Sequence, residues 1–134
     1  MSIDCGGRTV SEAEILDFAR QYDPQWFHTD LERARAGRWN GLISSGWMTC
    51  CIAMEMVVHK ILDGSDCFGS PGIDNLRWLH PVRPGDVLHL TVEVLESRVS
   101  KSGKSGVVRW QWLLDNQQGT RVLELTATSL FDIS

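Results

Sequence analysis

The stretch that decides the fold is SGWMTCCIAMEMVVHKIL, residues 45–62, which is apolar on most of its sides. Ser44 or Ser45 can cap its start and Gly64 lies just past its end, so the stretch is expected to form a helix. A membrane-spanning helix needs about 20 mainly apolar residues, and polar side chains interrupt this one. We therefore expect a helix that is buried within the protein and does not cross a membrane.

Beyond this helix the hydrophobic period changes to two, which is the period of a β-strand. Apolar and polar residues alternate over 88–94 and over 108–114, and a third long run covers 121–131. A shorter strand is expected at 76–79, before the turn HPVRPGD, and turns that contain glycine separate the long runs. Helices followed by antiparallel strands are typical of an α+β domain, and an antiparallel sheet wrapped around a long central helix is the hot-dog fold.

The region before the buried helix contains two further helix signals. Ser11 and Glu14 have the spacing of a capping box, and apolar residues then recur at helical intervals, which predicts a helix over 11–22. A short helix is expected over 30–36, with Asp30 as its N-cap.

The composition is that of an ordinary globular chain. With 134 residues, 43% of them hydrophobic and 22% charged, one domain covering residues 1–134 is expected. A net charge of −4 without a cluster of basic residues argues against a nucleic-acid partner. The amino terminus has no basic region followed by an apolar run, so we expect no secretory signal and a cytoplasmic protein.

The cysteines and most of the histidines show no metal-ligand spacing, so no metal site is expected. The cysteines are expected to be reduced thiols, and the two inside the buried helix are expected to pack as small apolar side chains. The three histidines outside the stretch discussed next are expected to be surface or packing residues. The four cysteines are Cys5, Cys50, Cys51 and Cys67, and the three histidines are His59, His80 and His89.

Residues 22–28, YDPQWFH, place an acid and an imidazole on a break in the chain. Pro24 ends the preceding helix and disfavours the helical conformation at Asp23, so His28 is expected on an irregular segment. By itself the stretch fits a structural role, because aspartate before proline is common at helix ends and an aromatic pair can anchor a loop.

Residues 41–49, GLISSGWMT, lead a glycine and two serines directly into the buried helix. The free N–H groups of the first helical turn and the positive end of the helix dipole then point at one place, where an oxyanion can be held. Ser44 and Ser45 are equally explained as helix caps, so this segment indicates an oxyanion site only in combination with other motifs.

Three segments, in their order and at their separations, together resemble the MaoC-like dehydratases, which include the R-specific enoyl-CoA hydratases. The segments are FARQYDPQWFHTD at 18–30, GLISSGW at 41–47 and LRWLHPVRPGDVL at 76–88. The resemblance covers about residues 8 to 131. It implies a hot-dog fold, hydration of a 2-enoyl thioester or the reverse dehydration of a 3-hydroxyacyl thioester, and a homodimer or larger even homo-oligomer. It implies no cofactor, since coenzyme A or the pantetheine of a carrier protein is part of the substrate.

The resemblance also assigns roles to particular residues. Asp23 and His28 match the acid and the imidazole of the family's hydratase motif, and Gly46 matches the glycine whose backbone N–H faces the thioester carbonyl. Ser45 matches the residue before that glycine. Trp26 stands where proline is usual, so the shape of the pocket is expected to differ from that of many members.

The substrate pocket is expected to involve further side chains. Ser45, Trp26 and Trp47 are predicted to contact the substrate, and Arg83 is a candidate for the phosphates of coenzyme A because an acidic protein must concentrate positive charge locally to bind them. A solvated charge on a turn is the alternative for Arg83.

These residue types suit water addition across an activated double bond. The reaction needs a base for the water, an acid for the α-carbon and donors for the developing enolate oxygen. Asp23 and His28 supply the first two, in an order that the sequence leaves open, because histidine titrates near neutrality and a partly buried aspartate can have its pKa raised. Gly46 supplies the third, because glycine permits close approach of the thioester to the backbone.

Two other functions compete with hydration. A hot-dog acyl-CoA thioesterase would use a carboxylate on the central helix, for which Glu55 is the candidate, although Glu55 is equally explained as a partner of His59 one turn later. A non-catalytic acyl-thioester binding or partner subunit is expected if Trp26 fills the place of the water.

Overall fold

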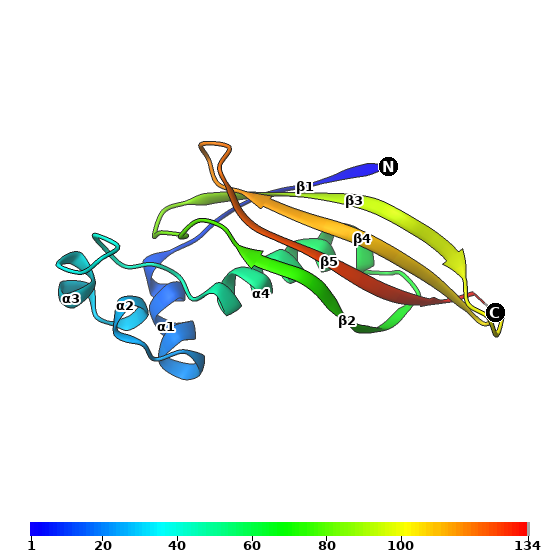
Figure 1. Cartoon of the computed structure of the whole chain (residues 1–134), viewed down its shortest axis with the longest axis horizontal. Coiled ribbons are helices and arrows are strands. Elements are labelled where there is room, and N and C mark those ends of the chain that lie inside the picture. Colours follow the sequence, from blue (N-terminus) through cyan, green and yellow to red (C-terminus); the bar gives the residue numbers. More distant parts are fainter. Residues whose placement is uncertain (134) are drawn as a thin grey trace.

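Five strands form one antiparallel sheet in the order β1-β3-β4-β5-β2 (Figure 1). The structure is a computed structural model, and it describes residues 1–133. The strands are β1 (Ser2–Thr9), β2 (Cys67–Trp78), β3 (Val87–Val99), β4 (Ser105–Asp115) and β5 (Arg121–Asp132). The three long strands predicted from the period of two therefore form the middle of the sheet.

The two edge strands differ from the prediction. No strand was predicted for residues 2–9, and the strand predicted at 76–79 begins instead at Cys67. Both edges contain glycine and have irregular registers, with shifts between Asp4 and Gly7 in β1 and at three places in β2. Edge strands tolerate glycine and proline because one side makes no ladder hydrogen bonds, so the alternation that marks a central strand is weak in them.

The helices lie before and against the sheet. They are α1 (Glu12–Tyr22), α2 (Trp26–Thr29), α3 (Leu31–Arg35) and α4 (Gly46–Val57), the last continued by a π-helical turn, η1 (Val58–Leu62). The predicted capping box of α1 is present, and Asp30 caps α3. The expected irregular segment around His28 is instead the single turn α2. Short helices α1 to α3 gather beside the N-terminal end of α4 (Figure 1).

The core lies between α4 and one face of the sheet. Leu88, Leu90 and Val92 of β3 are fully buried, as their alternation predicted, and so is Val57 of α4. This arrangement confirms the α+β hot-dog fold. The helix is not buried on all sides, however, because Met54 is 42% exposed. Within the described residues, no helix combines the length and the apolar character needed to cross a membrane.

The thiols follow the prediction only in part. All four cysteines are free. Cys50 is half-buried, and burial raises the pKa of its thiol, as expected for a packing residue. Cys51 is exposed on α4, so the expectation that it packs in the core is wrong.

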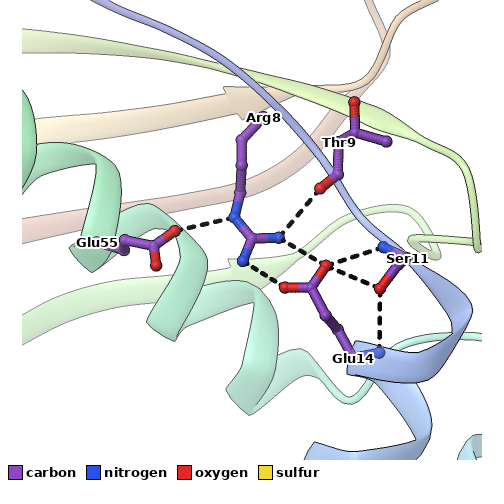
Figure 2. Close-up of polar contacts among 5 residues, drawn as sticks. All are labelled: Arg8, Thr9, Ser11, Glu14 and Glu55. Carbon is purple, nitrogen blue, oxygen red and sulfur yellow. Dashed lines mark hydrogen bonds and ion pairs between the residues drawn. The ribbon is translucent and has the colours of Figure 1, made fainter.

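A polar cluster around Arg8 ties β1, α1 and α4 together (Figure 2). Arg8 Nε donates to Glu55 Oε1 at 2.9 Å, and the other guanidinium nitrogens donate to the Glu14 carboxylate. Glu14 Oε1 in turn accepts from the N–H and the hydroxyl of Ser11. The partner of Glu55 is therefore Arg8 and not His59, because β1, which the sequence did not reveal, brings the guanidinium to α4.

Glu14→Gln is expected to lower the free energy of unfolding at neutral pH by about 1 kcal/mol, through loss of the ion pair and weakening of the cap. The hydrogen bond from Arg8 lowers the pKa of the Glu14 carboxyl. Its stabilisation is therefore complete above the unfolded-state pKa and is lost as the pH falls through the folded-state pKa. Urea denaturation of both proteins across an acid pH series measures the difference, which should shrink toward low pH. Glu12→Gln, in the same turn, is the control. A difference in the free energy of unfolding between wild type and Glu14→Gln that stays constant across the pH series would contradict the prediction.

Candidate active site

Asp23 and His28 meet because the chain reverses between them. Asp23 is the C-cap of α1, where its N–H donates to Ala19 O, and Pro24 prevents the helix from continuing. The single turn α2 then returns the buried ring of His28 toward α1, so that Nε2 lies 3.4 Å from Asp23 Oδ2. The pairing predicted from the sequence is present in the structure.

The backbone fixes the tautomer of His28. Its Nδ1 lies 2.7 Å from the carbonyl oxygen of Ile43, and a carbonyl can only accept a hydrogen bond, so Nδ1 carries a proton. In the neutral ring the lone pair is then on Nε2, which faces Asp23. The carboxylate oxygen and this lone pair are therefore two acceptors that lie 3.4 Å apart.

The Asp23 carboxylate is held from two sides. Gln25 Nε2 donates to Oδ1 at 2.8 Å, and Ser45 Oγ donates to Oδ2 at 2.7 Å. Burial favours a higher pKa, but these hydrogen bonds and the neighbouring His28 ring outweigh it, so the pKa of Asp23 lies below its ordinary value. The rise in pKa that burial alone would give Asp23 is therefore not found, because the two donors outweigh it. Asp23 is an anion at neutral pH and a weak proton acceptor.

The first turn of α4 brings a free backbone donor beside the pair. Ser45 is the N-cap, and its hydroxyl accepts from Trp47 N–H while donating to Asp23. The Gly46 N–H makes no hydrogen bond to any other described residue, as expected for the first residue of a helix. Gly46 also packs directly on Trp78, whose Nε1–H donates to Gly46 O at 2.8 Å.

A cavity of about 320 Å³ joins His28 to the start of α4. His28 and Gly46 both line it, with Thr49 and Val122 among the other lining residues. Asp23 does not line the cavity and is connected to it through its contacts with His28 and Ser45. A molecule bound in the cavity can therefore contact His28 and Gly46 directly, with the Asp23 carboxylate behind them.

The four predicted substrate contacts lie outside this cavity. Ser45 is fully buried and serves as a cap and as a partner of Asp23. Trp26 packs over Gly37 and under the guanidinium of Arg33, 4.4 Å from its ring, so it does not occupy the space beside His28. A prediction from sequence neighbours thus misplaced the Trp26 ring, because α2 turns it away from His28.

Trp47 and Arg83 are also near the cavity without lining it. Trp47 is 57% exposed and contacts Trp78 edge to face, with 5.4 Å between ring centroids. Arg83 Nη2 donates to Trp39 O at 2.6 Å, so its guanidinium fixes the loop that contributes Trp39 to the cavity wall. In the described part of the chain, both residues support lining residues and do not themselves line the site.

Several lining residues were missed by the sequence reasoning. Ser44 lies in the same segment as Gly46, and Thr49 follows Gly46 by three residues, which places both at one end of α4. Trp78 and His80 lie in the third family-like segment, and His80 was expected to be a surface or packing residue. Helical spacing from Gly46 could have identified Thr49. The position of β2 beside α4, which places Trp78 and His80, had no sequence signal.

The fold is that of a hot-dog protein. Its carboxylate–imidazole pair beside the start of α4 is a candidate acid–base site. The sequence model of the family described as MaoC like domain matches residues 3–113, and the chain belongs to this family. The structure is similar to that of the MaoC-like dehydratase from Rhodospirillum rubrum, with a TM-score of 0.89 and 35% identity, covering 100% of this chain and 92% of that one.

Two further similar proteins have names that do not mention a dehydratase. The monoamine oxidase regulatory protein from Archaeoglobus fulgius has a TM-score of 0.89 and 33% identity, covering 100% of this chain and 90% of that one. The uncharacterized protein YdeM of Bacillus subtilis (strain 168) is 33% identical over 115 residues, which are 86% of this chain and 81% of that protein. Family membership indicates hydratase or dehydratase chemistry in general.

Proposed function

We propose that the protein adds water across the double bond of a 2-enoyl thioester, or catalyses the reverse dehydration of a 3-hydroxyacyl thioester. One observation carries this proposal. The 3.4 Å pair of Asp23 Oδ2 and His28 Nε2 lies beside a cavity that Gly46, the first residue of α4, also lines. The MaoC-like dehydratase among the similar structures supports the same class of reaction.

In the proposed reaction one water molecule binds between Asp23 and His28. Its oxygen attacks C3 of the enoyl group while His28 Nε2 takes one of its protons, and the C2–C3 π electrons move to the thioester oxygen as an enolate. His28 then returns that proton to C2, so that OH and H are added in total. The lowered pKa of Asp23 keeps it ionised, which orients the water and stabilises the imidazolium.

The Gly46 N–H is proposed to hold the enolate oxygen. A helix N-terminus presents a fixed donor that needs no reorganisation when the negative charge develops. The thioester is carried by coenzyme A or by the pantetheine of a carrier protein, and the proposed steps use no metal or redox cofactor.

We propose that the working form is a homodimer or a larger even homo-oligomer. The outer side of α4 and the edge strand β2 expose apolar side chains, among them Trp47, Met54 and Ile73. Sheet edges and apolar helix faces are commonly covered by a second copy in closed symmetric assemblies. Light scattering of the purified protein tests this, and a monomer at working concentration would contradict it.

The geometry does not favour the competing functions. Glu55 pairs with Arg8 and lines shallow depressions on other sides of α4, so it is remote from the cavity with His28 and Gly46. Trp26, which would have to fill the water position in a non-catalytic binder, faces Arg33.

Incubation with crotonyl-CoA is expected to remove the enoyl absorbance without release of free thiol. Glu55→Gln should retain this activity, since Glu55 is outside the site. Thiol release that depends on Glu55 would instead establish a thioesterase. Inertness toward a series of enoyl thioesters of increasing chain length would overturn the proposal in favour of a binding subunit.

A further inference from the structure

The carbonyl oxygen of Ser45 accepts hydrogen bonds from three donors. The N–H of Thr49 lies 3.2 Å away, which is the ordinary first bond of α4. The hydroxyl of Ser44 donates at 3.1 Å, and the hydroxyl of Thr49 donates at 3.4 Å. A helical carbonyl needs only the first of these, so the two hydroxyl groups add to what the helix requires.

This carbonyl belongs to the same peptide group as the Gly46 N–H. The peptide is planar, so groups that fix the direction of the Ser45 C=O also fix the direction of the Gly46 N–H. Donors on the oxygen polarise the group as well, which makes its N–H a stronger donor, because hydrogen bonds in a chain reinforce one another. Ser44 and Thr49 thus act on the peptide group of Gly46, a residue that lines the cavity.

Both hydroxyl groups come from firmly held residues. Ser44 is 6% exposed and Thr49 is 2% exposed, and both line the cavity with Gly46. The Ser44 N–H donates to Val82 O at 2.8 Å, which anchors it to the loop before β3. A threonine hydroxyl that bonds back to the carbonyl four residues earlier slightly destabilises a helix, so this bond needs a reason other than stability.

We propose that Ser44 and Thr49 are positioning residues that aim and polarise the Ser45–Gly46 peptide toward the thioester oxygen. The inference rests on the proposed hydration, in which that peptide N–H holds the enolate. It assigns a kinetic role to two hydroxyl groups that touch neither Asp23 nor His28.

Three variants test the role in crotonyl-CoA hydration. Ser44→Ala and Thr49→Val should each lower kcat by about 5- to 20-fold, less than the roughly 10²- to 10³-fold loss of a whole oxyanion donor. KM should stay within about twofold, because the interaction strengthens in the transition state. Thr49→Ser keeps the hydroxyl and should restore kcat. Thr126→Val, a buried threonine of β5 away from the cavity, is the matched control.

Two kinetic outcomes would overturn the inference. An unchanged kcat in both Ser44→Ala and Thr49→Val would leave the hydroxyl groups with a purely structural role. A raised KM with unchanged kcat would mean that they bind substrate directly.

A spectroscopic measurement separates this inference from the proposed function and does not depend on turnover. Butyryl-CoA labelled with ¹³C at the thioester carbonyl has no double bond to hydrate, and its bound C=O stretch reports the donor strength of the Gly46 N–H. The stretch should move to lower frequency on binding to the wild type, and move less in Thr49→Val and in Ser44→Ala. Equal shifts in all proteins would overturn the positioning role even if hydration is observed. A reduced shift in the variants, with a wild type that hydrates no enoyl thioester, would refute the proposed reaction while keeping the positioning role.

Discussion

Asp23→Asn is expected to lower kcat for hydration of crotonyl-CoA by about 10²- to 10⁴-fold, which is the usual contribution of a positioned acid–base group. The amide keeps the size of the side chain and can still accept from Ser45, so the fold should be retained. It lacks the negative charge that stabilises the imidazolium of His28 and orients the water between Oδ2 and Nε2. Steady-state kinetics with circular dichroism on the same preparation measures both effects.

The matched control is Asp17→Asn, which changes an exposed carboxylate on the same helix α1. It should leave both kcat and the thermal unfolding unchanged. His28→Ala should lose hydration to a similar degree, since it removes the proton carrier. Full activity in both Asp23→Asn and His28→Ala would show that the pair is not the catalytic site.

Gly46→Ala is expected to lower kcat by about 10²- to 10³-fold, as for loss of an oxyanion donor. A Cβ at this position would lie 2.5 Å from Trp78 Cε2 and 2.7 Å from Nε1, closer than real contacts allow. The indole is a rigid ring that also donates to Gly46 O, so either Trp78 or the first turn of α4 has to move. Each movement redirects the Gly46 N–H away from the cavity.

The effect on stability distinguishes this displacement from a general loss of structure. Alanine favours helix over glycine by about 1 kcal/mol, which offsets part of the strain, so unfolding should change far less than the rate. Gly69→Ala in β2 is the control, because a Cβ there meets no atom within 4 Å. Wild-type kcat in Gly46→Ala would contradict the predicted displacement, because alanine retains the backbone N–H at position 46.

The sequence predicted the parts of the fold that depend on neighbours in the chain. The Ser11–Glu14 capping box, the buried helix from Ser45 and the three alternating strands are all local patterns, and all are present. The edge strands β1 and β2 were missed or shortened because their pairing with β3 and β5 compensates for glycines and irregular registers that weaken the local signal.

The site divides in the same way. Asp23, His28 and Gly46 were identified from short motifs. In the structure His28 pairs with Asp23, and it lines the same cavity as Gly46. A raised pKa of Asp23, a substrate contact by Trp26 and a pairing of Glu55 with His59 are not found in the structure. The first and the last depend on residues of other segments, Ser45 and Arg8, whereas α2 turns the Trp26 ring away from His28.

The sequence by itself determined the capped helices, the three central strands and the side chains that form the candidate acid–base site. Only the tertiary structure decided which donors surround those side chains, as with Ser45 on Asp23, Ile43 on His28 and Trp78 on Gly46. The physical reason is the separation along the chain over which each interaction acts. Capping and periodicity act over a few residues, whereas the pairings that complete the site, such as Ser45 with Asp23 and Trp78 with Gly46, join segments that are far apart along the chain.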